Sequence, residues 1–130
     1  MSNNKEGGNM SEEKKGKNEE LGLPRDSMKK IQIAFDVDGT LRCNCTNTCE
    51  DPNKDIVALF KILKKFKNTN LFVWSGGGSD YAFRFASKFD LGVSQAKCLS
   101  KFDRGFTPDI AIDDIQDTAL GTINLIVKEK

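Results

Sequence analysis

Short runs of apolar residues alternate along this chain with longer stretches in which apolar residues recur at helical spacing. Short apolar runs bounded by polar residues or glycines predict buried strands. Five such runs occur: one that begins at Ile31, and those over 71–74, 93–99, 108–114 and 122–127. The run over 93–99 is the weakest strand candidate. Because strands and helices alternate, the pattern predicts an α/β fold with a mainly parallel sheet covered on both faces.

Two amphipathic helices are predicted between these strands. For the first, we interpret Asp51 as the N-cap and Pro52 as the first helical residue, and the polar residues 68–70 as its end. The second begins near Ser79 or Asp80. The apolar residues that share a face are Ile56, Leu59, Phe60, Leu63 and Phe66 in the first helix, and Ala82, Phe85, Ala86 and Phe89 in the second.

The first part of the chain differs in composition from the rest. Residues 1–28 are rich in Asn, Gly, Glu and Lys and almost without apolar residues, so they cannot bury enough surface to offset the loss of chain entropy. We therefore expect a disordered polar tail over 1–28. Residues 29–130 are expected to form one domain, which is long enough for a single modest core.

Charge and hydropathy argue against several classes of function. The 130 residues include 20 basic and 19 acidic ones, so the net charge of +1 does not indicate a nucleic-acid partner. No apolar stretch approaches the ~20 residues that span a bilayer, and the N-terminus lacks the apolar segment of a secretory signal. We expect a cytoplasmic protein without a membrane partner, whose cysteines are not paired in disulfides.

Polar residues that could carry chemistry follow three of the predicted strands. The first strand ends in Asp36 and Asp38, Ser75 follows the second, and Asp113 with Asp114 ends the fourth. Carboxylates are costly to bury unpaired, so these acids suggest a bound cation or a charge that develops in a reaction; a turn-capping Asp-Gly is the structural alternative. Because ligands bind beyond the carboxyl ends of parallel strands, we expect these side chains to share one active site.

Together these residues resemble the motifs of the haloacid dehalogenase-like superfamily. The match covers about 31–127 and rests on the order of Asp36-Val37-Asp38-Gly39-Thr40-Leu41, Ser75, a downstream lysine and Asp113-Asp114. The resemblance implies a three-layer α/β/α, Rossmann-like fold and a phosphatase acting on phosphate monoesters. Asp36 would be the nucleophile that forms an aspartyl-phosphate, and Asp38 the general acid and base. Dehalogenases and P-type ATPases of the family lack the second aspartate, so its presence favours phosphoryl transfer to water.

The resemblance also implies a magnesium site. Its ligands would be Asp36, the main-chain carbonyl of Asp38, and the side chains of Asp113 and Asp114, a set of oxygen donors that magnesium prefers. Asp117 is a weaker candidate, because it is more simply explained as the cap of a following short helix.

The transferring phosphoryl group would lie against the end of the second strand. The resemblance implies that the Ser75 hydroxyl and the backbone N–H groups of Gly76 and Gly77 donate hydrogen bonds to this phosphoryl group there. We count Thr40 with them as a substrate-binding residue. The glycines 76–78 could instead form only a flexible turn.

A lysine that neutralises the phosphate is also required by the family. Lys88 lies within the second predicted helix, too early in the fold. We favour Lys101 over Lys97, because Lys101 stands just past the third predicted strand and shortly before the fourth. The alternative for each lysine is an exposed surface charge.

Larger members of the family carry a cap domain, which is inserted at one of two points in the chain. The insertion points hold only 42–51 and 101–107, so we expect no cap domain and an open site for a phosphorylated small molecule or macromolecule end. A homo-oligomer is a further expectation, since another subunit could cover a small substrate. The first insertion contains three thiols, those of Cys43, Cys45 and Cys49. They could bind a structural zinc ion, with Cys98 of the third predicted strand as a possible fourth ligand, or they could remain free.

Two other classes of function compete with the phosphatase. One is a non-catalytic phosphate- or protein-binding module that uses the cysteine loop for interaction, although a binder has no need of Asp38. The other is a phosphotransferase with an alcohol acceptor, which an open site that admits water disfavours.

Overall fold

The structure is a computed structural model that describes residues 29–43, 46, 48–102, 105–115 and 120–128. The predicted tail, 1–28, lies outside these residues. Within them, none of the helices has the length and apolar content needed to cross a membrane.

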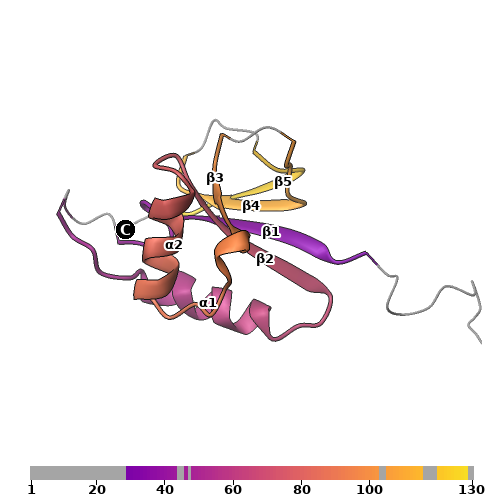
Figure 1. The fold of residues 1–130 in the computed structure, drawn as a ribbon, viewed down its shortest axis with the longest axis horizontal. Coiled ribbons are helices and arrows are strands. Elements are labelled where there is room, and N and C mark those ends of the chain that lie inside the picture. The colour runs from indigo at the N-terminus through magenta and orange to yellow at the C-terminus, as the bar shows by residue number, and fades with distance from the viewer. Residues whose placement is uncertain (1–28, 44–45, 47, 103–104, 116–119, 129–130) are drawn as a thin grey trace, which may run out of the picture.

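Five parallel strands form one sheet (Figure 1). They are β1 (Ile31–Asp36), β2 (Thr69–Ser75), β3 (Cys98–Ser100), β4 (Ile110–Asp113) and β5 (Ile123–Ile126), in the order β3-β2-β1-β4-β5. All four pairings are parallel, so the predicted α/β fold with a mainly parallel sheet is confirmed.

The strand order reverses next to β1. The chain adds β2 and β3 on one side of β1, and then crosses to place β4 on the other side. In the register, Phe35 of β1 faces Val73 of β2 and Ile112 of β4, so these three strands end at nearly the same level. A reversal of this kind opens a crevice beyond the carboxyl ends of the strands.

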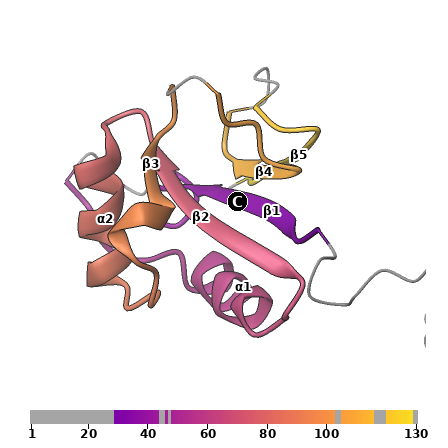
Figure 2. The same cartoon turned by 45° about the vertical axis from the view of Figure 1, so that its right-hand side comes forward.

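Both helices pack against the same face of the sheet, as Figures 1 and 2 show. They are α1 (Lys54–Lys64) and α2 (Ser79–Lys88). Phe60 of α1 and Phe85 of α2 are fully buried in one core with Phe35 and Val73 of the sheet. The amphipathic pattern of both helices is thus explained, because each turns its apolar side toward the strands.

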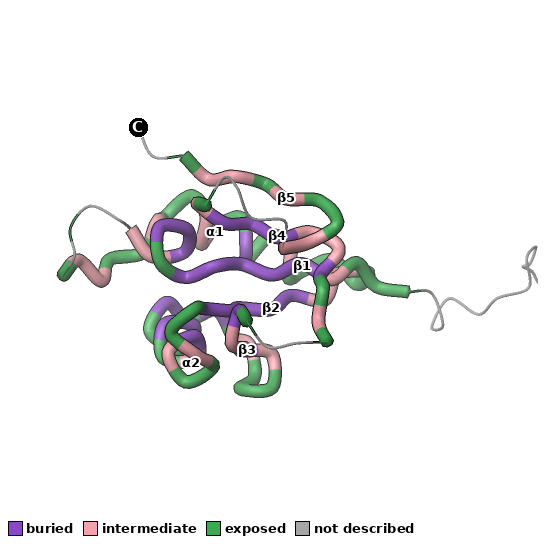
Figure 3. Tube along the Cα trace, turned by 90° about the horizontal axis from the view of Figure 1, so that it is seen from above, coloured by how far each residue is buried: buried purple, intermediate pink, exposed green. Residues whose placement is uncertain are grey.

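The opposite face of the sheet is covered differently. Ala34, Phe72 and Trp74 are buried there beneath Phe106, whose ring centroid lies 4.7 Å from that of Phe72. Among the described residues no helix covers this face, so a third layer stays a prediction. Figure 3 shows that burial is concentrated in the central strands β1, β2 and β4, whereas edge strand β5 is partly exposed.

The start of α1 was predicted wrongly. The N-cap position is Asn53, and the helix begins at Lys54. Asp51 instead accepts a hydrogen bond from the backbone N–H of Cys43 at 2.8 Å, and Pro52 forms an isolated bridge with Arg42. These backbone contacts hold 51–53 extended beside the loop that follows β1, so the helix cannot begin earlier.

The third strand is shorter than predicted. Only Cys98–Ser100 is a strand, and Gln95–Lys97 before it forms a turn of 3₁₀ helix. The strand pairs with the last three residues of β2, so that its carboxyl end reaches the same edge as Ser75. The prediction that Phe66 belongs to the apolar face of the first helix was also wrong. The helix α1 ends at Lys64, and Phe66 beyond it is half exposed.

Candidate active site at the carboxyl edge of the sheet

Four buried polar residues meet where the strands end. Asp36, Ser75 and Asp113 are the last residues of β1, β2 and β4, and Lys101 follows the end of β3. The backbone N–H of Lys101 donates to the carbonyl of Ser75 at 2.9 Å, which ties the lysine to the neighbouring strand. The expected convergence of distant residues at this edge is therefore present in the structure.

Lys101 bridges two carboxylates. Its Nζ lies 2.7 Å from Oδ1 of Asp36 and 2.9 Å from Oδ2 of Asp113, and the residue is only 9% exposed. The other candidate lysines lie elsewhere. Lys97 bonds to Asn70 at the opposite edge of the sheet, and Lys88 pairs with Glu50 on the surface at 2.9 Å.

Burial dominates the electrostatics of the site. Desolvation raises the pKa of Asp36 to about 7, against the opposing effect of Lys101 and reinforced by Asp113 and Asp114. Burial raises the pKa of Asp114 too, together with its neighbour Asp113. For Lys101, burial lowers the pKa, but the hydrogen bonds to Asp36 and Asp113 outweigh it, and the net shift is upward. The lysine is therefore charged, whereas burial favours the protonated forms of Asp36 and Asp114.

Three of the acids lie close enough together to hold a metal ion. Asp36, Asp113 and Asp114 each offer a carboxylate oxygen within 4.8 Å of the others. Such hard oxygen donors fit magnesium, which uses few carboxylates and keeps several waters. Gly39 is also required here: its φ is +77°, and a Cβ at this position would overlap the Asp114 carboxylate. Asp117, the weaker metal candidate, lies outside the described residues.

A glycine turn connects β2 to α2 beside these acids. The Ser75 Oγ accepts a hydrogen bond from the backbone N–H of Gly77 at 2.9 Å, so its own O–H is free to donate. Gly78, with φ of +107°, occupies the N-cap position of α2. The turn therefore directs a hydroxyl and a helix N-terminus toward the crevice, an arrangement that suits an anion.

Thr40 lies deeper than expected of a residue that contacts substrate. It is fully buried, and its Oγ1 donates to Oδ2 of Asp36 at 3.3 Å. With Lys101 on Oδ1, both oxygens of the Asp36 carboxylate have a donor. Thr40 therefore orients Asp36 in this structure.

Asp38 is exposed and held by two side chains that were not predicted. Its Oδ1 accepts hydrogen bonds from the Tyr81 hydroxyl at 2.7 Å and from Nη1 of Arg42 at 3.0 Å, while its side chain stays 54% exposed. Burial and then the bond to Asp38 raise the pKa of Tyr81. Arg42 stands four residues after Asp38, a spacing that could have been noticed, whereas nothing in the sequence connects Tyr81 to it.

Phe102 is a further residue that the sequence did not single out. It follows Lys101, is 72% exposed, and lies against Gly76, where an added Cβ would be 3.2 Å from its ring. An exposed aromatic ring thus lies at the rim of the crevice, next to the glycine turn.

The cysteines are only partly described. Cys98 is buried in the core next to α2, with its Sγ 3.6 Å from the Ser94 carbonyl, while Cys43 and Cys49 lie in the loop after β1. These three thiols form no common metal site, since the acidic cluster is the one such group among the described residues. Cys45 lies outside them, so zinc binding by the loop cysteines stays a prediction.

The fold and site thus define an α/β protein with an acidic, lysine-bridged cluster at the carboxyl edge of its sheet. Comparison with protein-family models, with curated proteins and with solved structures finds no significant match to this chain. The functional interpretation rests on the motifs and on the geometry of the site.

Proposed function

We propose that this chain is a magnesium-dependent phosphohydrolase of the haloacid dehalogenase-like type that works through an aspartyl-phosphate. The observation that carries the proposal is the position of the Lys101 ammonium between Asp36 and Asp113, within a cluster of three carboxylates. A buried cation beside a buried carboxylate of raised pKa is typical of a catalytic site.

In the first step, a carboxylate oxygen of Asp36 attacks the phosphorus of a phosphate monoester. A new P–O bond forms to Asp36 as the bond to the leaving oxygen breaks, and Asp38 gives that oxygen its proton. Lys101 balances the charge of the phosphoryl group. The Ser75 hydroxyl and the N–H groups of the following glycines bind its oxygens.

In the second step, water attacks the phosphorus of the aspartyl-phosphate. Asp38, now ionised, accepts a proton from this water, and the P–O bond to Asp36 breaks to release inorganic phosphate. Asp36, Asp113 and Asp114 are the side chains that would hold magnesium, together with the carbonyl of Asp38. When bound, the ion offsets the negative charge of the acids and of the phosphoryl group.

Tyr81 and Arg42 act as positioning residues in this scheme. They hold one oxygen of Asp38 and leave the other for the proton that moves to and from the substrate. Arg42 is itself fixed by a 2.6 Å bond from its Nε to the Cys49 carbonyl, so the loop after β1 helps to orient Asp38.

We predict that Tyr81→Phe lowers kcat by about 3- to 10-fold for an alkyl phosphate, because one hydrogen bond that orients Asp38 is lost. An aryl phosphate with an acidic phenol as leaving group serves as the internal control, since it needs little proton donation. Steady-state kinetics on both substrates test this. A loss of equal size on the two substrates would contradict a role through Asp38.

We further propose the three-layer, capless form of the fold, with a site open to a bulky phosphorylated substrate or covered by a second subunit. The exposed Asp38 and the exposed ring of Phe102 support an open rim. An aromatic side chain next to the phosphate turn would stack on a planar group of the substrate.

A panel of phosphate esters tests the proposed function. It contains nucleotides, sugar phosphates, phosphopeptides and nucleic-acid ends, assayed for phosphate release with magnesium and with a chelator. We expect magnesium-dependent turnover of at least one class. Absence of turnover throughout, with magnesium still bound, would reject the phosphatase in favour of the non-catalytic binding module.

A further inference from the structure

We propose that a second anion site lies at the opposite, amino edge of the sheet, and that it binds the diphosphate group of a small molecule. This edge holds a pocket of about 300 Å³ between the starts of β1, β2 and β3. It shares no residue with the crevice around Asp36, and the proposal does not depend on the phosphatase activity.

Three lysines from separate parts of the chain line the pocket. Lys30 precedes β1, Lys64 is the last residue of α1, and Lys97 ends the turn before β3. No acidic residue lines it, and none of the three lysines makes an ion pair within the described part of the chain. Three cations gathered without a carboxylate repel one another, and a bound anion would relieve this repulsion.

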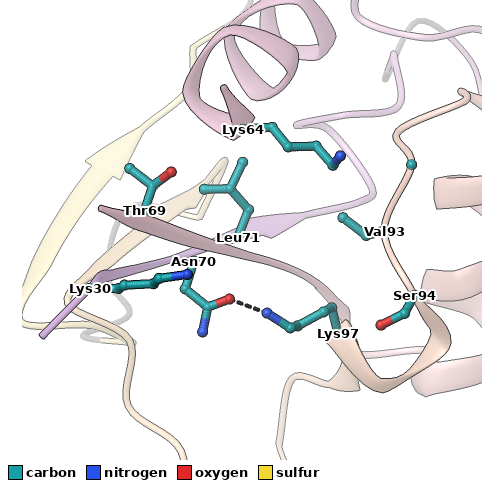
Figure 4. A pocket seen from close by; sticks show the side chains of 9 residues that line it. Lys30, Lys64, Thr69, Asn70, Leu71, Val93, Ser94 and Lys97 are labelled. Atoms are coloured by element: carbon teal, nitrogen blue, oxygen red, sulfur yellow. Dashed lines mark hydrogen bonds between the residues drawn. The ribbon is translucent and has the colours of Figure 1, made fainter. Parts of the chain in front are cut away.

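Lys97 and Lys64 reach the pocket from different sides. Figure 4 shows Lys97 and Asn70 on one side of β2, where Lys97 is bonded to the Asn70 amide oxygen. Lys64 reaches a different part of the pocket, where its Nζ would lie 3.4 Å from a Cβ built on Gly92. Cations that reach the pocket from different sides suit an anion with two charged groups better than a single phosphate.

The remaining lining favours a small polar ligand. Leu71 and Val93 are the apolar lining residues, whereas Ser94 and the Asn70 amide can donate hydrogen bonds. Lys97 is oriented by the Phe72 ring, whose centroid lies 5.1 Å from its Nζ, so this ammonium is already in place for a ligand. The volume is at the lower end of the range for small-molecule sites, roughly 300–1,000 Å³, which suits a diphosphate rather than a whole coenzyme.

The test is a ¹⁵N NMR titration of the full chain with inorganic pyrophosphate in the absence of magnesium. We expect saturable shifts of the Asn70, Gly92, Val93 and Ser94 amides. A parallel titration with ADP should shift the same amides, and adenosine should not, which separates the diphosphate group from the nucleoside. Shifts confined to Gly76 and Gly77, or shifts that never saturate, would overturn the proposal.

Lysine variants locate the site independently. Lys64→Gln and Lys30→Gln should each weaken pyrophosphate binding by about 3- to 10-fold, because each removes one charge-assisted contact. Lys61→Gln is the matched control: it also removes an exposed lysine from α1, but outside the pocket, and should leave the affinity unchanged. Equal affinity in the Lys64→Gln, Lys30→Gln and Lys61→Gln proteins would refute the site, and the amide spectrum of each variant reports whether it is folded.

Discussion

Asp36→Asn is expected to reduce phosphate release by at least about 10³-fold, because the amide cannot act as the nucleophile. The substitution is nearly isosteric: the amide oxygen can still accept a hydrogen bond from Lys101, and the Thr40 hydroxyl can rotate to accept one from the amide NH2. Lys101 also keeps its 2.9 Å contact with Asp113. The folded structure should therefore survive, and the loss should fall on kcat.

Phosphate release by Asp36→Asn is measured with magnesium on the best ester of the panel. Asp51→Asn is the matched control, since Asp51 is an exposed acid outside the crevice, and it should retain full turnover. Intact-mass analysis after rapid acid quench should detect a phosphorylated species in the wild type and not in Asp36→Asn. Turnover by the variant within about tenfold of the wild type would exclude Asp36 as the nucleophile.

A second large effect is expected on stability: without divalent metal, the free energy of unfolding falls as the pH rises from about 4 to about 7. Burial raises the pKa of Asp36 from 3.8 to about 7 in the folded protein. Between these values the folded state holds a proton that the unfolded state has lost, so stability decreases with pH. The total loss is up to about 4 kcal/mol, at 1.36 kcal/mol for each unit of pKa shift.

The neighbours of Asp36 do not reverse this sign. The pKa of Asp114 is raised as well, so it contributes in the same direction. The raised pKa of Lys101 matters only in alkaline solution, where its proton is lost. Magnesium should restore the stability of the wild type near neutral pH, because the ion binds the ionised acids of the folded state alone.

Urea denaturation in a chelator at pH values between about 5 and about 8 measures this dependence. The stability of Asp36→Asn should depend on pH less steeply than that of the wild type, because only Asp114 then contributes. The variant should also be more stable than the wild type near pH 8 and less stabilised by magnesium. A wild type whose stability stays constant or rises over the same range in chelator would contradict a desolvated Asp36. Asp51→Asn again serves as the control and should follow the wild type.

The structure shows which of the two candidate lysines lies among the acids, a question on which the sequence supplied only a preference. Lys97 and Lys101 flank the third strand, which the structure limits to Cys98–Ser100. A parallel strand directs the residue before it to the amino edge and the residue after it to the carboxyl edge. Lys97 therefore lies at the basic pocket and Lys101 between the acids, although only four positions separate them.

Other parts of the site depend on contacts that no local pattern encodes. Tyr81 reaches Asp38 only because the first turn of α2 lies beside the loop after β1. The same loop, by pairing its backbone with 51–53, displaced the start of α1 from the position that Asp51 and Pro52 predicted. Local capping preference contributes about 1 kcal/mol, and tertiary hydrogen bonds of this kind readily override it.

The sequence by itself determined the parallel α/β sheet and the set of polar residues at its carboxyl edge. Apolar runs that end in Asp36, Ser75 and Asp113 predict buried parallel strands, and the carboxyl ends of parallel strands lie at one edge of the sheet. Only the tertiary structure decided which cation joins these acids, which side chains hold Asp38, and that a second cluster of lysines forms at the other edge. Those features depend on distances between elements far apart in the chain, and such distances are fixed only when the whole core packs.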